Sequence, residues 1–397
     1  MKKPARRIHT IDILRAIAIL LMVLAHVYDN WLQPDSWWIG AFSYLILSPF
    51  GVPGFVFCSG LSFGFSWDKN KRKGLLRSQN ARYSLSRTYI ILGIAFGYNL
   101  VGVLLHGGGW GNLWFWYILQ TIAVARLISI VFMRLSRLAR LITSFIIIAF
   151  THFLFFSLFS CQSDSGVCQF FYWFAFNSVN ADSLFFFFPF FLIGTVFGEI
   201  MSEFREDGIS KNMIRQWLLL GLITTVIAVL MGGSPSSYNF GWEKLISGIN
   251  THPEINLSQF PLFLTRNSYA WVLYSLGLLI VFMTIFYYFL DYRNIKKGDS
   301  TPAKILFVVL EPFGKYSLTI YITHYVLHLM PVSLSYRWIL FAYFGLCGII
   351  WAMVAAIHRF TSGKLSIEFI VGYYAKEIYE WQEDRIAHET MDNKENH

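Results

Sequence analysis

Charged side chains are scarce in this chain. Asp, Glu, Lys and Arg make up 14% of its 397 residues, whereas 55% are hydrophobic and 19% aromatic, and the mean hydropathy is +0.50. So few charged groups cannot cover the surface of a soluble globule of this size. The composition therefore excludes a soluble protein and predicts a multi-pass membrane protein.

Acidic residues are the scarcer of the charged groups, with 23 Asp and Glu against 32 Lys and Arg. The formal net charge of +9 could indicate a nucleic-acid partner. The basic residues, however, lie in short stretches between apolar runs and are not gathered on one polar domain with interleaved aromatics. Nucleic acid is therefore excluded as a partner, and the charge is assigned to the topology in a lipid bilayer.

Cysteine is also rare, and none of the four cysteines belongs to a C-x-x-C pair or a Cys/His cluster. This absence argues against a structural metal, and we expect none. Cys161 and Cys168 flank a turn-forming run, Gln-Ser-Asp-Ser-Gly-Val, on the side of the membrane where oxidation is permitted. We predict a disulfide between them.

Apolar runs of about 20 residues, the length that crosses a bilayer as a helix, recur along the chain. The predicted fold is an all-α, polytopic transmembrane helix bundle in one membrane domain, residues 1–365. Residues 366–397 are predicted to form an amphipathic helix on the cytoplasmic face, followed by a disordered polar tail from Arg385. The ten expected spans are roughly 12–32, 48–67, 88–105, 113–133, 141–160, 183–201, 216–232, 269–290, 316–334 and 338–357.

The distribution of basic residues sets the predicted orientation. With the N-terminus inside, 26 of the 32 Lys and Arg fall in cytoplasmic segments and three, Lys244, Arg266 and Arg337, in outer loops. Cytoplasmic loops carry such an excess in membrane proteins. Both termini are therefore predicted to be cytoplasmic. The basic start could pass for a signal peptide, but the run after it is long, carries charge and lacks a small-x-small cleavage site, so we interpret it as a retained first helix.

The first span carries four ionisable side chains: Asp12, Arg15, His26 and Asp29. Arg15 and His26 are eleven residues apart, which on an α-helix is three turns plus about 20° and about 16 Å along the axis. Asp12 and Asp29 fall within about 60° of the same face. Because charge inside a membrane is expensive, this stripe must face protein or a wet cavity and is a candidate functional site.

Two interpretations of the stripe compete. In one, Asp12 and Arg15 pair at i,i+3 and only anchor the helix in the headgroups, while a neighbouring carbonyl satisfies His26. In the other, His26 is a general base and Arg15 binds the anionic end of a cofactor one pantetheine arm away.

The Asp12-x-x-Arg15-x(10)-His26 pattern resembles the first helix of integral-membrane acyltransferases. The residue sequence of this helix is similar to that of the heparan-α-glucosaminide N-acetyltransferase-type branch and its bacterial relatives. The acyltransferase-3 family is the next most similar. Further matches come in the same order and cover most of the chain. They are Phe50-Gly-Val-Pro-Gly-Phe-Val-Phe-Cys-Ser-Gly60, Trp116-Tyr-Ile-Leu-Gln-Thr-Ile-Ala123, Phe188-Pro-Phe-Phe-Leu-Ile-Gly194 and Phe313-Gly-Lys-Tyr-Ser-Leu-Thr-Ile-Tyr-Ile-Thr-His324.

The resemblance implies transfer of an acyl group, expected to be acetyl, from cytoplasmic acetyl-CoA or another acyl-CoA to a glycan or glycolipid at the outer face of a bacterial cytoplasmic membrane. His26 would deprotonate the acceptor or carry the acyl group, and Asp29 would raise its basicity from one turn away. Arg15 would bind the donor, with Asp12 orienting it. The remaining candidates are His324 at the acyl site, Lys315 for donor phosphate, and Gln120 for the thioester or the acceptor.

A transporter or flippase of small anions or lipid-linked sugars is the alternative, because intramembrane Arg, His and Asp could also line a substrate path. Inverted repeats would favour it, and the halves show no convincing self-similarity. The sequence leaves the acceptor and the oligomeric state open, a homo-oligomer included.

Overall fold

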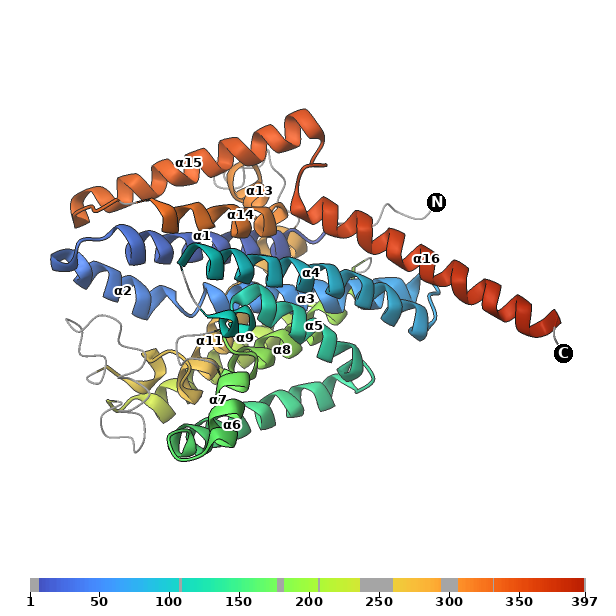
Figure 1. The fold of residues 1–397 in the computed structure, drawn as a ribbon. Coiled ribbons are helices and arrows are strands. Elements are labelled where there is room, and N and C mark those ends of the chain that lie inside the picture. Colours follow the sequence, from blue (N-terminus) through green and yellow to red (C-terminus); the bar gives the residue numbers. More distant parts are fainter. Residues whose placement is uncertain are drawn as a thin grey trace.

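The structure, a computed structural model, describes residues 7–106, 109–176, 182–205, 208–235, 260–293, 306–330 and 332–395. These residues fold almost entirely into helices, most of which run side by side in one bundle (Figure 1). Within this part of the chain the β-type contacts are two isolated bridges, Leu32 with Leu334 and Pro235 with Pro261. The predicted all-α polytopic bundle is confirmed.

Eight segments among the described residues are long and apolar enough to cross a membrane, and each overlaps an expected span. The second of them begins at Trp38 and runs through α2 (Trp37–Leu47) and α3 (Val52–Arg72). The others are α1 (His9–Trp31), α4 (Arg77–His106), α6 (Arg137–Cys161), α8 (Leu184–Glu203), α9 (Lys211–Gly232), α11 (Tyr269–Phe286), which a π-helical turn η6 (Tyr287–Tyr292) extends, and α15 (Tyr336–Thr361).

The remaining two expected spans have a different backbone. Residues 113–133 contain α5 (Ile118–Phe132), of 15 residues, after the 3-10 turn η2 (Trp110–Trp114). In place of a helix over 316–334 there are α13 (Glu311–Lys315), α14 (Ser317–Thr323) and the 3-10 segment η8 (His324–Leu329), with the π-helical turn η7 (Leu306–Leu310) before them. A count of apolar residues does not reveal such breaks, which often mark functional positions.

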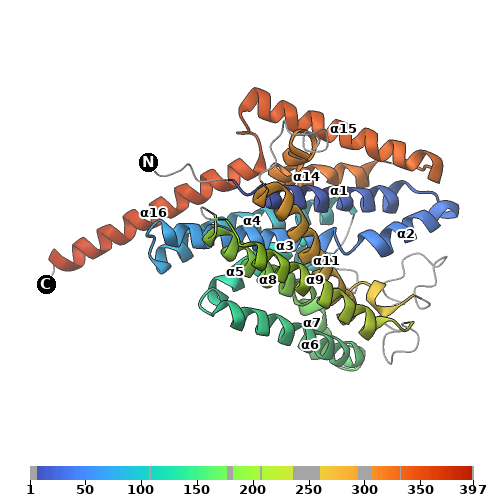
Figure 2. The ribbon, with the colours of Figure 1, turned by 180° about the vertical axis from the view of Figure 1, so that it is seen from behind.

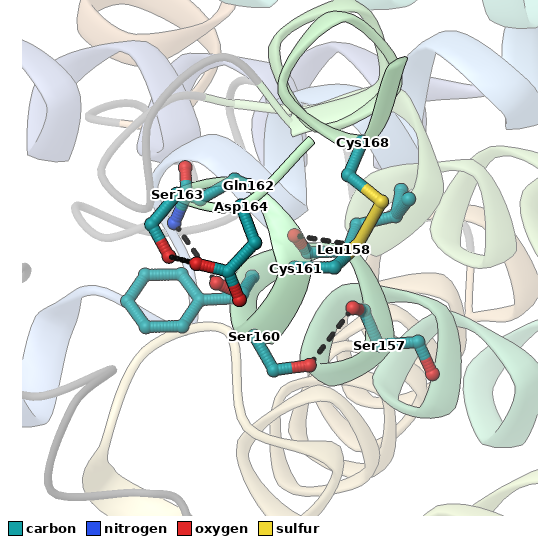
Figure 3. Close-up of a disulfide and its surroundings, with 9 residues drawn as sticks. Ser157, Leu158, Ser160, Cys161, Gln162, Ser163, Asp164 and Cys168 are labelled. Carbon is teal, nitrogen blue, oxygen red and sulfur yellow. Dashed lines mark hydrogen bonds between the residues drawn. A yellow bond between two sulfur atoms is a disulfide. The ribbon is translucent and has the colours of Figure 1, made fainter. Parts of the chain in front are cut away.

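A disulfide joins the end of α6 to α7 (Gly166–Phe176), a short helix that the sequence analysis missed. Cys161 and Cys168 are bonded, with their Cα atoms 5.7 Å apart (Figure 3). The side chains of Ser163 and Asp164 hydrogen-bond to each other in the tight turn between them. The predicted disulfide is confirmed.

The closest helix pair is α3 with α8, at the middle of the bundle (Figures 1 and 2). Gly60 and Gly64 on α3 meet the backbone of α8, and Gly194 and Gly198 on α8 meet the backbone of α3, so closely that an added Cβ would clash. Small residues four apart allow this approach in membrane bundles. The Gly60-Leu-Ser-Phe-Gly64 run, which matches a hydrolase nucleophile pattern, is therefore a helix-packing element.

Helix α1 lies inside the bundle, next to α3, α13, α14 and α15 (Figures 1 and 2). Fourteen of its 23 residues are buried, whereas five of the 22 residues of the peripheral helix α9 are. The polar stripe of α1 consequently lies largely among other helices, as its charges require, while the Asp29 side chain is 49% exposed.

The last helix, α16 (Ile367–Glu395), packs against α4 and extends past the bundle at the end where α3 ends and α4 begins (Figures 1 and 2). Arg82 pairs with Glu383 at 2.7 Å, and Tyr83 contacts Tyr379. A helix was predicted here, but the disordered tail expected from Arg385 is wrong, since the helix continues to Glu395. We call this end of the bundle the inner end and the opposite one the outer end, following the predicted topology.

Candidate functional site

Two of the candidate residues, His26 and His324, are in contact although they are far apart in the sequence. Their imidazole rings stack with centroids 5.0 Å apart and 30° between the planes. His26 comes from the outer half of α1, and His324 from the point where α14 tightens into the 3-10 segment η8. His324 is 4% exposed, whereas the His26 side chain is 31% exposed. We call these two residues, together with Asp29, Tyr321, Tyr98, Tyr117 and Phe55, the histidine layer.

The tautomer of His324 follows from its backbone contact. Its Nδ1 is hydrogen-bonded to the carbonyl oxygen of Tyr321, three residues earlier. A carbonyl only accepts, so Nδ1 carries the proton, and in the neutral ring Nε2 does not. Asp29 lies on the other side of the pair, with its Oδ2 4.0 Å from Nδ1 of His26. At that distance the contact is a charge interaction and not a hydrogen bond.

Aromatic side chains continue the histidine layer across the bundle. The Tyr321 ring contacts His324 at 5.3 Å, Tyr98 of α4 at 5.5 Å and Phe55 of α3 at 6.3 Å. Tyr98 in turn contacts Tyr117, just before α5, at 5.7 Å. Four helical segments thus meet around His324, and no pattern in the sequence distinguishes Tyr98 from the other tyrosines among its 21.

An ion pair stands at the outer rim of this layer. Arg266 is hydrogen-bonded to Asp182, and its charge also acts on Asp29. Burial raises the pKa of Asp182 to about 6, although Arg266 acts in the opposite direction. Neither residue of the pair was among the candidates from the sequence.

Arg15 lies eleven residues before His26 on the same helix, about 16 Å further inward. Its guanidinium donates to the Ser62 hydroxyl and, at 3.3 Å, to the carbonyl of Gly314. Gly314 makes this possible because its missing side chain lets α13 contact the backbone of Asp12. Arg15 is therefore held by α3 and α13, and it is half-buried.

Two further arginines, which are not among the candidates from the sequence, share the level of Arg15. Arg87 of α4 and Arg126 of α5 each have a buried Nε with no hydrogen-bond partner among the described residues. Arg126 is 9% exposed and lies 4.9 Å from the centroid of the Phe63 ring. The charge of Arg15 acts on Arg87, and that of Arg87 on Arg126. We call Arg15, Arg87 and Arg126 the arginine layer.

An acidic side chain, Glu368, acts on Arg87 of this layer, and other contacts engage its carboxylate. Glu368 of α16 is close enough for its charge to act on Arg87. Its carboxylate accepts hydrogen bonds from the backbone N–H groups of Leu318 at 2.6 Å and Thr319 at 3.2 Å, and from the Thr319 hydroxyl at 2.6 Å. Glu368 thus caps α14, and the arginine layer keeps a net positive charge.

The other inward candidates have different partners from those expected. Asp12 pairs with Arg7 at 2.7 Å, and the hydrogen bonds of Arg15 go elsewhere, so the prediction that Asp12 orients Arg15 is wrong. Arg7 precedes α1, and its side chain extends forward to Asp12 in the first turn of that helix. Lys315 pairs with Glu311 at 2.7 Å. Burial alone would raise the pKa of Glu311, but the hydrogen bonds and charges of His9 and Lys315 lower it to about 2.

Gln120 lies in the outer half of the bundle and not in the arginine layer. It is fully buried, and its Oε1 accepts a 2.7 Å hydrogen bond from Asn99 of α4.

Among the described residues, no group of three or more His, Cys, Asp or Glu side chains could hold a metal ion. The site consists of a cationic layer and a layer of imidazole, amide and phenol groups, which suits binding of an anionic donor and proton transfer at separate places.

A family model for the acyltransferase domain matches residues 8–358, nearly the whole chain. The chain belongs to the acyltransferase-3 family. A search of curated proteins finds no match. The protein is therefore a membrane acyltransferase, which favours the enzyme over the transporter alternative.

In this acyltransferase the structure shows which of the candidate residues from the sequence lie close together. His26, Asp29 and His324 share the histidine layer, whereas Arg15 belongs to the arginine layer. A signal for Arg126 was present in the sequence, since it is a charge inside an expected span. Arg87 was counted with the cytoplasmic loop because it immediately precedes the expected span 88–105.

Proposed function

We propose that this acyltransferase moves an acetyl group from cytoplasmic acetyl-CoA to a hydroxyl or amino group of a glycan or glycolipid at the outer face of a bacterial cytoplasmic membrane. The observation that supports the proposal is the pairing of two layers along α1. An arginine layer with excess positive charge lies about 16 Å from a stacked pair of histidines.

The arginine layer is suited to the phosphates of coenzyme A. A buried Nε–H without a hydrogen-bond partner among the described residues destabilises the protein, so Arg87 and Arg126 are expected to have a ligand that offsets this cost. Phosphate groups match guanidinium geometry with paired, charge-assisted hydrogen bonds. Lys315 is a weaker candidate for the same role, because Glu311 already neutralises it.

The separation of the layers suits the rest of the donor. The pantetheine arm joins the phosphates to the thioester, and its extended length is comparable to the distance of about 16 Å from Arg15 to His26. Phosphates held by arginines at the inner end would therefore place the thioester near His26 and His324. The arm itself is uncharged and needs no cationic side chain between the layers.

The chemical step needs a base at the histidine layer. In direct transfer, His26 takes the proton of the acceptor hydroxyl or amine as that atom attacks the thioester carbonyl. A C–O or C–N bond forms, the C–S bond breaks, and the thiolate of coenzyme A leaves and receives the proton. In the alternative, a neutral His26 nitrogen attacks the thioester carbonyl, the C–S bond breaks and the coenzyme A thiolate leaves. The acceptor then attacks the acetyl-imidazole, the C–N bond to His26 breaks, and the acceptor proton passes to the thiolate. Asp29 would stabilise the imidazolium in the first route.

His324 is assigned to positioning and to the proton path. Its protonated Nδ1 is fixed by the Tyr321 carbonyl, so its ring plane is set before the donor arrives. The stacked ring of His26 is then held in one orientation against it.

The proposal is tested with the full-length protein in lipid nanodiscs. Coenzyme A should bind much more tightly than pantetheine, which lacks the phosphates, and the difference should shrink with added salt. Labelled acetyl-CoA mixed with membranes that contain the natural acceptor should yield labelled glycan or glycolipid. Equal affinity for coenzyme A and pantetheine would overturn the donor assignment, and a lack of protein-dependent label in any glycan fraction would overturn the reaction.

A further inference from the structure

A buried amide pair between α4 and α5 has no role in the chemistry above. Asn99 is 2% exposed and Gln120 is fully buried. The Asn99 Nδ2 donates to Gln120 Oε1 at 2.7 Å and to two backbone carbonyls that precede α5, those of Leu113 at 2.9 Å and Phe115 at 3.0 Å. The pair thus fastens the outer part of α4 to the chain that leads into α5.

These contacts fix which way both amides point. If Asn99 were turned over, its oxygen would face two carbonyl oxygens, which repel it. If Gln120 were turned over, two NH2 groups would meet. The arrangement therefore leaves an acceptor, Asn99 Oδ1, and a donor, Gln120 Nε2, on buried amides that already contact each other.

Neither of these atoms has a hydrogen-bond partner within the described parts of the chain. Leaving a buried donor or acceptor unpaired costs about 1–3 kcal/mol per group. A hydroxyl group complements this pair, because it accepts one hydrogen bond and donates another from a single oxygen. The pattern does not suit phosphate, which offers acceptors and would meet the Asn99 oxygen unfavourably.

The surroundings of the pair indicate where such a hydroxyl comes from. Asn99 is bonded to the segment around η2, which belongs to the outer half, and its neighbour Tyr98 contacts Tyr117 and Tyr321. Tyr321 in turn contacts His324. Rings of this kind pack against sugar faces as well as against each other. The pair therefore lies on α4 and α5 in the outer half, and Tyr98, the residue before Asn99, is linked to His324 through two ring contacts.

We propose that Asn99 and Gln120 bind a hydroxyl of a carbohydrate acceptor and thereby hold the sugar against the histidine layer. This inference rests on the proposed function and assigns Gln120, for which the sequence left the thioester and the acceptor open, to the acceptor. Binding through two neutral amides would fix the position of the sugar without taking part in proton transfer.

The test uses Gln120→Met, which has a similar length but no hydrogen-bonding amide, and Gln120→Glu, which keeps an acceptor for Asn99 and loses the Nε2 donor. Ser129→Ala is the matched control, since it removes another buried, unpartnered polar group from the same helix. Each full-length variant is mixed with [14C]acetyl-CoA and increasing amounts of membranes from source cells that lack their own copy of the gene. Coenzyme A binding and the apparent unfolding temperature are measured in parallel.

Both Gln120 variants should need roughly tenfold more membrane for half-maximal labelling, from the loss of a hydrogen bond to the ligand. Coenzyme A affinity should stay within about twofold, and Ser129→Ala should match the unaltered protein. Unchanged half-saturation in either folded Gln120 variant, or weaker coenzyme A binding, would overturn this inference alone. No label with the unaltered protein would overturn the proposed function, and this inference with it. If Gln120→Met does not fold, Gln120→Glu decides, because it retains the bond from Asn99.

Discussion

The arginine layer and the histidine layer share helices α1 and α4, but their polar groups differ in how they are paired. At the inner level, the buried Nε atoms of Arg87 and Arg126 have no hydrogen-bond partner among the described residues, at the expense of stability. At the outer level, His324 is hydrogen-bonded to the backbone and surrounded by rings. Under the proposed function, binding energy would come from one level and chemistry from the other, so variants at the two levels should have defects of different kinds.

The orientation in the membrane is the most severe test of this comparison. A reporter that is active only in the cytoplasm should give signal when fused after residue 75 or 297 and none after residue 110 or 245. The split of basic residues, 26 in the segments predicted to be cytoplasmic against three in the outer loops, leaves little freedom for the reverse. Signal at residue 110 would place the arginine layer on the side without coenzyme A.

Replacement of His26 should give the largest loss of activity. His26→Ala removes the base or the acetyl carrier, so turnover should fall by a factor of about 10² or more, while coenzyme A affinity stays within about twofold. Steady-state transfer and equilibrium binding are measured on the same preparation. His358→Ala is the control, because His358 is exposed and bonded to Tyr316 away from the pair. Full activity of His26→Ala would make His324 the next base to test.

Replacements in the arginine layer should show the reverse pattern. Arg15→Ala, Arg87→Ala and Arg126→Ala should each weaken coenzyme A binding about tenfold or more, because a charge-assisted hydrogen bond contributes about 1.5–3 kcal/mol. Arg15→Lys should restore part of the affinity, since an ammonium lacks the planar fork of donors.

The control for the arginine layer is Arg82→Ala, on the same helix as Arg87 but paired with Glu383. Its coenzyme A affinity should match that of the unaltered protein. If the three test variants lose turnover with unchanged affinity, the separation of binding from chemistry is wrong.

The cost of the arginine layer should itself be measurable. Arg126→Leu replaces a buried, unpaired charge with an apolar side chain, so the ligand-free protein should unfold at a temperature higher by roughly 2–4 °C. Coenzyme A should stabilise the unaltered protein more than the variant, because it binds the folded state through this residue. A lower unfolding temperature for Arg126→Leu without ligand would show that the guanidinium has a structural role.

The sequence predicted the individual residues of the site better than their contacts. The helical spacing of Arg15 and His26 is a local property, and both lie on the buried α1 as expected. The contact between His26 and His324 depends on how α14 breaks into η8, which no count of apolar residues reveals. Arg87 was missed because the edge of a span is the least certain part of a hydropathy pattern.

The expected pair of Asp12 and Arg15 failed for a related reason. Spacing of i,i+3 permits a contact on a helix, but tertiary partners decide whether it forms. Ser62 and Gly314 bind the guanidinium of Arg15, and Arg7 binds the carboxylate of Asp12. Ser62 of α3 lies between Gly60 and Gly64, which pack against α8. Its contact with Arg15 joins two helices, so it could be found only from the structure.

The disulfide should have the smallest effect on both layers. Cys161 and Cys168 close a short loop between α6 and α7, and the contacts that define the layers come from α1, α3, α4, α5, α14 and η8. The double variant Cys161→Ser with Cys168→Ser should therefore keep coenzyme A affinity and turnover within about twofold, although a loop of this size can contribute about 2–3 kcal/mol to stability.

A membrane-impermeant maleimide should label the unaltered cysteines in intact cells only after a reductant is added. Immediate labelling would remove the disulfide, and no labelling after reduction would place the hairpin at the inner end. Loss of turnover in the double variant would mean that the α6–α7 hairpin communicates with the histidine layer, and the comparison would then have to include a third region.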